Sequence, residues 1–183
     1  MGRSSMSSAA TTDRPALDPL PPALVVGLGN PILGDDGVGW RVIDELERRV
    51  GGDPARIGSV EFDRMSVGGL ALMERLVGYE RAIIVDAVVG PDRPGTIRTR
   101  PLREVAMHPG SQLDSAHDAS LTEAIEAGRA LGARLPGDIT VVGIAVRRVD
   151  EFGERLSPPV ADAVATAAGT IVRLLNARPD RAG

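Results

Sequence analysis

The segment ALVVGLGN, residues 23–30, places a short apolar run directly before a glycine-rich turn. Its length and its β-branched valines are typical of a buried strand. After the turn, apolar residues recur at helical spacing from Val38 to Val50, and Gly51 and Gly52 end the helix. A strand, a glycine turn and a helix in this order predict the opening unit of an α/β fold, with its ligand chemistry at the turn.

Strands and helices continue to alternate beyond this unit. Ser120-Leu121-Thr122-Glu123 has the pattern of a capping box and predicts a helix start at Ser120, and Ser157 followed by Pro158 predicts the start of the last helix. The remaining patterns predict strands at 57–62, 81–88 and 139–146, helices at 70–77, 120–132 and 157–175, and a hairpin-like piece at 95–100. The fold class expected is α/β: three layers, with a mostly parallel twisted sheet and helices on both faces.

One domain accounts for the periodic part of the chain. Residues 23–176 carry all the predicted elements and form a single α/β domain. Residues 1–22 are rich in Ser, Pro and Ala without a continuous apolar run, which predicts a disordered N-terminal tail and not a signal peptide. Residues 177–183 are predicted to be a frayed C-terminus.

Composition excludes several classes of function. The formal net charge is −4 and there is no basic stripe with interleaved aromatic residues, so nucleic acid and anionic membranes are poor partners. No apolar stretch approaches the roughly 18 residues of a membrane span, and we expect a cytoplasmic protein. The chain has no Cys, and all 21 of its basic residues are Arg, which excludes thiol chemistry and a lysine Schiff base.

Polar residues fall at the predicted carboxyl ends of the first three strands. In an open parallel sheet these ends share one edge, where ligands bind. If the first strand lies between the second and the third, the side chains converge there with His117, which is expected in the loop before Ser120. The candidates are Asn30, Asp35 and Asp36 after the first strand, Asp63 after the second, and Asp86 near the end of the third.

Structural roles compete with a functional one at each position. An Asp after a strand is most often a turn former or a helix cap, and Asp35 fits that role best because it directly precedes the first helix. Asp86, within an apolar run, could serve mainly to hold a neighbouring loop by hydrogen bonds. The other histidine, His108, lies beside Pro109 and Gly110 and is assigned no role.

The glycine turn also shares the opening of a dinucleotide-binding fingerprint. The fingerprint requires a third glycine three residues after Gly29, and this chain has Ile32 at that position. The acidic pair Asp35-Asp36 would repel a phosphate at the helix N-terminus. A dinucleotide site is therefore not expected, and an acid at this place suits a cation or a proton better.

The whole string GLGNPILGDDGVG, residues 27–39, resembles the signature of the hydrogenase maturation protease family: G-x-G-N, four variable residues, D, an acid, and commonly G-x-G. Three further segments agree in order. Asp63 with the Gly-Gly-Leu at 68–70 resembles the segment after the family's second strand, and Ser115-Ala116-His117 resembles its S-x-H loop. Residues 141–144 through 152–158 are similar to its closing strand, loop and helix start.

The resemblance implies an endopeptidase that removes the C-terminal extension from the nickel-loaded large subunit precursor of a [NiFe] hydrogenase. It implies Asp36, Asp63 and His117 as nickel contacts, with Asn30, Asp35 and Asp86 in support. Many members carry Glu where this chain has Asp36, and Asp also occurs there. Nickel is expected to arrive with the precursor. The hydrolytic step stays open between a metal-polarised carbonyl or water and a general base, for which Asp36 and Asp63 are the catalytic candidates.

Two other functions were weighed. Peptidyl-tRNA hydrolase also contains a G-L-G-N-P string, but its following T-R-H-N segment is absent here, and the acidic charge suits RNA badly. A non-enzymatic nickel-dependent assembly factor would share every ligand named above. Whether the precursor shortens when the protein is added distinguishes this factor from a protease.

Overall fold

A computed structural model describes residues 23–51, 59–106 and 116–177, and the side chains of 105, 106 and 116–120 are outside it. The predictions for residues 1–22, for 178–183 and for His108 fall outside these ranges. The strands of the described part form one sheet in the order β2-β1-β3-β5-β4. They are β1 (Ala23–Leu28), β2 (Val60–Met65), β3 (Arg81–Val89), β4 (Ile97–Pro101) and β5 (Asp138–Val146). The first strand lies between the second and the third, as the site prediction requires.

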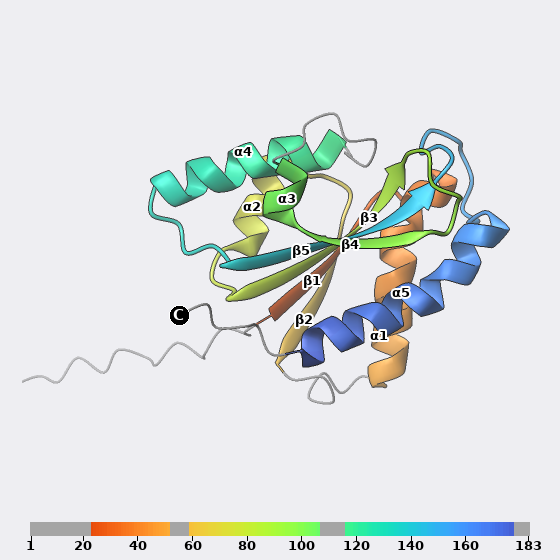
Figure 1. The fold of residues 1–183 in the computed structure, drawn as a ribbon, viewed down its shortest axis with the longest axis horizontal. Coiled ribbons are helices and arrows are strands. Elements are labelled where there is room, and N and C mark those ends of the chain that lie inside the picture. Colours follow the sequence, from red (N-terminus) through yellow and green to blue (C-terminus); the bar gives the residue numbers. More distant parts are fainter. Residues whose placement is uncertain (1–22, 52–58, 107–115, 178–183) are drawn as a thin grey trace, which may run out of the picture.

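Helices cover both faces of this sheet (Figure 1). One apolar core lies under α1 (Val38–Val50) and α5 (Pro158–Asn176). The other lies under α2 (Gly69–Leu76) and α4 (Ala116–Ala130), with the short α3 (Leu102–Ala106) beside it. Neighbouring residues of β1 alternate between the two cores, because successive side chains of a strand point to opposite faces. The predicted three-layer α/β fold is confirmed.

The sheet is mostly parallel, with one antiparallel edge. β1 pairs in parallel with β2 and β3, and β3 with β5. β4 pairs antiparallel with β5, which follows it by 37 residues from Pro101 to Asp138. The hairpin-like interpretation of residues 95–100 was therefore wrong, because the partner of this strand is distant in sequence.

The bounds of β2 and α4 differ from the prediction at residues of the candidate site. β2 runs to Met65 and includes Asp63, which was expected beyond the end of the strand. This edge strand can contain charged side chains because ion pairs with neighbouring helices compensate their charges on both faces of the sheet. α4 begins at Ala116, so Ser120 lies inside the helix and the capping-box prediction was wrong. Alanines at 116 and 119 are strong helix formers, which lets the helix extend past the polar residues around them.

The start of α1 packs directly on the ends of two strands. A Cβ at Gly39 would lie 2.3 Å from the carbonyl oxygen of Leu28 in β1 and 2.7 Å from that of Val85 in β3. Only a residue without a side chain permits this approach. Among the described residues, no helix combines the length and the hydropathy needed to cross a bilayer.

Candidate active site at the carboxyl edge of the sheet

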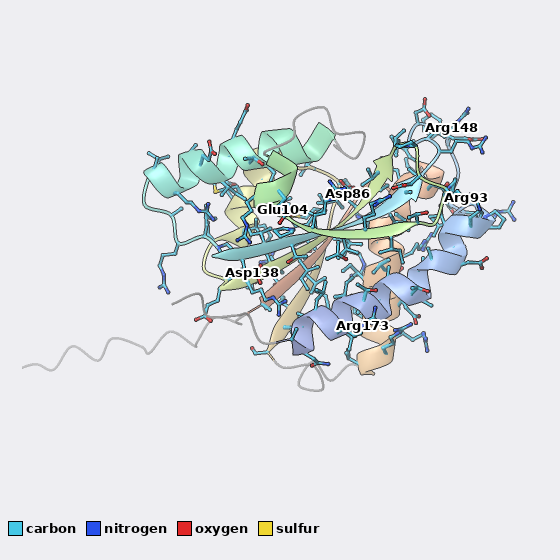
Figure 2. The ribbon with its side chains drawn as sticks, in the orientation of Figure 1. Asp86, Arg93, Glu104, Asp138, Arg148 and Arg173 are labelled. Atoms are coloured by element: carbon cyan, nitrogen blue, oxygen red, sulfur yellow. The ribbon has the colours of Figure 1, made fainter. Side chains whose placement is uncertain are left out.

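The carboxyl ends of β1, β2, β3 and β5 lie at one edge of the sheet. Figure 2 shows Arg93 and Arg148 in loops at this edge, and Asp138, the first residue of β5, at the opposite end. The loop after β1 passes into a short 3-10 helix, η1 (Gly34–Gly37), which leads into α1. Asn30, Asp35 and Asp36 therefore lie together at this edge.

Asp36 folds back onto the turn that precedes it. Its Oδ2 accepts a hydrogen bond of 2.6 Å from the backbone N–H of Asn30. Its carbonyl oxygen would lie 1.8 Å from a Cβ at Gly29, whose φ is +119°. The glycine of the G-N pair is required because the Asp36 backbone fills the space that a side chain would take.

Asp35 connects this loop to the last helix. Its Oδ1 accepts from the backbone N–H of Ser157 at 2.6 Å, and its Oδ2 accepts from the Ser157 hydroxyl at 2.7 Å. Backbone hydrogen bonds join Gly34 and Ile32 to Gly153 in the loop between β5 and α5. Ser157 is the N-cap residue of α5, as predicted, but its hydroxyl serves Asp35 and not the helix. Asp35 thus has a structural role, although its partner is α5 and not the helix that follows it.

Asp63 lies on β2 opposite Val26 of β1, on the sheet face covered by α2 and α4. Its Oδ1 accepts from the backbone N–H of Arg64 at 2.7 Å. Its Oδ2 accepts from Nε of Arg75, on α2, at 2.5 Å. The half-buried carboxylate is therefore held from two sides, by the strand and by the helix above it.

Arg75 also joins Asp63 to a second carboxylate. Its Nη2 contacts Glu61, two residues earlier on the same face of β2, and its Nη1 donates to the Tyr79 hydroxyl at 2.7 Å. The Tyr79 hydroxyl in turn donates to Glu61 Oε2 at 2.6 Å, and the guanidinium carbon lies 5.3 Å from the Tyr79 ring centroid. We call Glu61, Asp63, Arg75 and Tyr79 the Arg75 cluster.

Electrostatics in the Arg75 cluster follow from burial and these contacts. Partial burial opposes the charge on Arg75, but the hydrogen bonds to Tyr79 and Asp63 outweigh it and raise the pKa of the guanidinium. Burial, and then the hydrogen bond to Glu61, raise the pKa of Tyr79. Near neutral pH the cluster therefore holds a charged arginine and a neutral tyrosine.

Asp86 is the most buried of the candidates, with 1% of its surface exposed. It lies two residues after Ile84 on the same face of β3, which is also the face of Asp63. Its Oδ1 accepts from the backbone N–H of Ala87 at 2.9 Å, which satisfies one backbone donor next to the carboxyl end of β3. This contact is within the strand, so it does not test whether Asp86 holds a loop.

His117 lies in the first turn of α4 and not in a loop, which corrects the prediction. α4 leads into the start of β5, so its own first turn lies toward the carboxyl edge, as Figure 1 shows. The side chain of His117 lies outside the described residues, and its role as a nickel contact stays a prediction. Among the side chains that are described, no three acids or histidines group closely enough to hold a metal ion.

Sequence reasoning missed the Arg75 cluster and the Ser157 partner of Asp35. A signal for the cluster exists in the sequence: Glu61 and Asp63 alternate on one strand face, and Arg75 and Tyr79 are spaced by four residues at the end of a helix. Nothing in the sequence pairs these two segments. The Asp35–Ser157 contact spans 122 residues and has no local signature.

Comparison with known proteins agrees with the fold and with the family that the sequence resembles. The family model for HycI, hydrogenase maturation protease, matches residues 41–174. The match begins two residues after Gly39, so it covers Asp63 and His117 but not the loop with Asp36.

Two curated relatives extend over most of the chain. The hydrogenase expression/formation protein HupD of Bradyrhizobium diazoefficiens is 31% identical over 142 residues, which is 78% of this chain and 71% of that protein. The hydrogenase 2 maturation protease of Escherichia coli is 30% identical over 122 residues, 66% of this chain and 71% of that protein.

A solved structure shares the same architecture. The hydrogenase maturating endopeptidase HybD from E. coli superposes with a TM-score of 0.68 at 25% identity, covering 84% of this chain and 91% of that one. The family model, the curated relatives and the solved structure agree over most of the chain, and this protein belongs to the hydrogenase maturation protease family, a family of endopeptidases.

Proposed function

We propose that this protein removes the C-terminal extension from the nickel-loaded large subunit precursor of a [NiFe] hydrogenase, and that Asp36, Asp63 and His117 contact the nickel. The observation that carries the proposal is the sheet order. Asp36 lies in η1, which follows β1, and Asp63 lies on β2, the neighbour of β1, while the first turn of α4 lies toward the same edge. Family membership supplies the reaction class.

The residues fit a divalent cation in chemical type. A carboxylate oxygen can accept more than one contact, so the hydrogen bonds on Asp36 and Asp63 leave them acceptor capacity. Two carboxylates and an imidazole form a mixed oxygen and nitrogen donor set that suits a borderline ion such as nickel. Sulfur donors must come from the precursor, because this chain has no Cys.

In this proposal the nickel is part of the substrate. It identifies a precursor in which metal insertion is complete and places the peptide bond beside the edge of the sheet. The chain's own acids hold the metal, and Asp36 or Asp63 serves as the base for an attacking water. Asn30 and Asp35 support the loop, since the Asn30 N–H fixes Asp36 and Asp35 fixes the loop to α5.

We expect Asp36→Asn and His117→Ala each to abolish precursor processing while the protein keeps a cooperative unfolding transition. Asp36→Asn removes the charge of a proposed metal contact and keeps the size of the side chain, and His117→Ala removes the proposed imidazole ligand. Processing is followed as shortening of the precursor on a gel, and Asp162→Asn, at an exposed position on α5, is the matched control. Processing at the normal rate by either variant removes that residue from the site.

Nickel-loaded and nickel-free precursor, each mixed with metal-free enzyme, test the recognition step. We expect cleavage of the loaded form only, because three protein ligands leave coordination positions for the precursor to fill. Equal cleavage of the two forms rules out a nickel checkpoint.

A further inference from the structure

The Arg75 guanidinium lies where it can control how Asp63 meets a cation. Its Nε is 2.5 Å from Asp63 Oδ2, and its two terminal nitrogens are held by Glu61 and the Tyr79 hydroxyl. Guanidinium donors lie in one rigid plane, so contacts at all three nitrogens fix both its position and its orientation.

The cluster is built on rigid elements. Glu61 and Asp63 are on one face of β2, and Arg75 is in the last turn of α2, whose apolar face is buried against the sheet. Tyr79, which is 7% exposed, packs in the same core beyond the end of α2. A partner held this firmly sets the orientation of the carboxylate it contacts.

We propose that Arg75 is a positioning residue with two effects on Asp63: it orients the carboxylate for the precursor's nickel, and it competes with free divalent cations for Oδ2. The positive guanidinium repels a second cation at the same oxygen. Free nickel therefore binds weakly to the protein alone, whereas nickel presented by a docked precursor has further ligands and can bind Asp63 while Arg75 keeps its contact. The inference rests on the proposed nickel role of Asp63.

The deciding experiment is a calorimetric titration of the full chain with nickel chloride alone. Arg75→Gln removes the positive charge that repels the cation, and we expect nickel to bind at least about tenfold more tightly than to the natural protein. Arg75→Lys keeps the charge and should stay near the natural affinity. The matched control is Arg64→Gln: Arg64 neighbours Asp63 in β2, but its guanidinium pairs with Asp44 and Glu47 on α1.

The rate of precursor processing is a second measurement, and we expect it to fall in the variant that binds nickel more tightly. Arg75→Gln should process loaded precursor more slowly, because Asp63 loses the donor that orients it. A merely structural role would not tighten nickel binding while slowing cleavage. The double variant Arg75→Gln/Glu61→Gln keeps the net charge of the Arg75 cluster and avoids repulsion between Glu61 and Asp63. It tests the inference if the single variant does not fold. The double variant should also bind nickel more tightly than the natural protein.

Unchanged nickel affinity in a folded Arg75→Gln or double variant overturns the inference. Asp63→Asn then separates this failure from failure of the proposed function. If Asp63→Asn stops processing while Arg75→Gln leaves nickel affinity unchanged, Asp63 keeps its role and only the Arg75 inference is wrong. If Asp63→Asn processes normally, the proposed site and the inference both fail.

Discussion

Gly29 and Asp36 occupy the same small volume at the carboxyl end of β1. The backbone carbonyl of Asp36 passes over the Cα of Gly29, and the Asp36 side chain accepts from the next N–H along the turn. The conformation of the turn at Gly29 and Asn30 thus depends on the contacts that Asp36 makes with it. A change at either residue moves the other.

Gly29→Ala should therefore act on both stability and processing. Its Cβ would lie 1.8 Å from the Asp36 carbonyl oxygen, at a φ of +119° that side chains rarely adopt. We expect the free energy of unfolding to fall by about 2 kcal/mol or more, and processing to be lost because Asp36 is displaced. Urea unfolding and the gel assay measure the two effects.

Gly153→Ala is the control for that change. Gly153 lies in the adjoining loop and bonds to Ile32 and Gly34 through its backbone, but nothing lies within 4 Å of a Cβ added to it. The variant should resemble the natural protein in both measurements. A Gly29→Ala variant that keeps the natural stability and processing, as expected for Gly153→Ala, would show that the turn accommodates a Cβ at Gly29.

At the scale of elements, the hydrogen bonds of Asp35 with Ser157 connect η1 to the start of α5. Asp35→Ala leaves the Ser157 N–H and hydroxyl without their acceptor and should lower the free energy of unfolding by about 2 kcal/mol. Ser157→Ala removes only the hydroxyl contact and should cost about 1 kcal/mol. In the double variant the losses should not add, and additive losses would contradict direct coupling.

α1 carries an ion-pair cluster that makes stability depend on pH. Hydrogen bonds from Arg48 and Arg49 lower the pKa of Glu45 to about 2. Because this pKa is below its unfolded value of roughly 4.3, the charged form stabilises the folded state above that pH, and the effect disappears as pH falls toward 2. The stability difference between the natural protein and Glu45→Gln should be constant from pH 7 to about 5 and vanish near pH 2.

Chemical denaturation at several pH values tests this expectation. Glu80→Gln, an exposed glutamate in the turn before β3, serves as the control. A Glu45→Gln difference that persists at pH 2 would mean that the arginines do not stabilise the folded state through the Glu45 charge.

The elements that could be predicted from the sequence are those whose signals are local. The apolar run at 23–28, the helix ended by Gly51 and the Ser157-Pro158 start were all correct within the described chain. The partner of β4 could not be predicted, because strand pairing over a long separation leaves no mark in the strand itself. The helix start differs because the capping-box pattern at Ser120 lies inside α4, where Ala116 and Ala119 favour an earlier start.

The candidate site divides in the same way. Asp36, Asp63 and His117 stay predictions from the family resemblance, and the predicted position of the first strand between the second and the third is correct. The ion pair of Asp63 with Arg75 and the anchoring of Asp35 by Ser157 depend on which elements pack together, and only the three-dimensional structure supplies that.

For the whole molecule, the absence of Cys gives a direct prediction about inhibitors. Iodoacetamide should leave precursor processing unchanged when only the enzyme is pretreated, because there is no thiol to alkylate. Serine-directed reagents should also fail, since no nucleophile motif surrounds a serine. Labelling of a serine in step with lost activity, detected by mass spectrometry, would contradict this. Pretreated precursor is the control for thiols on the substrate.

The contact between Asp35 and Ser157 also constrains when a newly made copy can begin to work. The turn that presents Asp36 is translated early, but the residue that anchors it follows 122 positions later, at the start of the last helix. While the ribosome is still adding that helix, the turn lacks its anchor, and about twenty further residues must emerge before α5 can pack against the sheet. In a newly made copy, the turn that presents Asp36 is therefore fixed in place only after the segment that begins at Ser157 has been made.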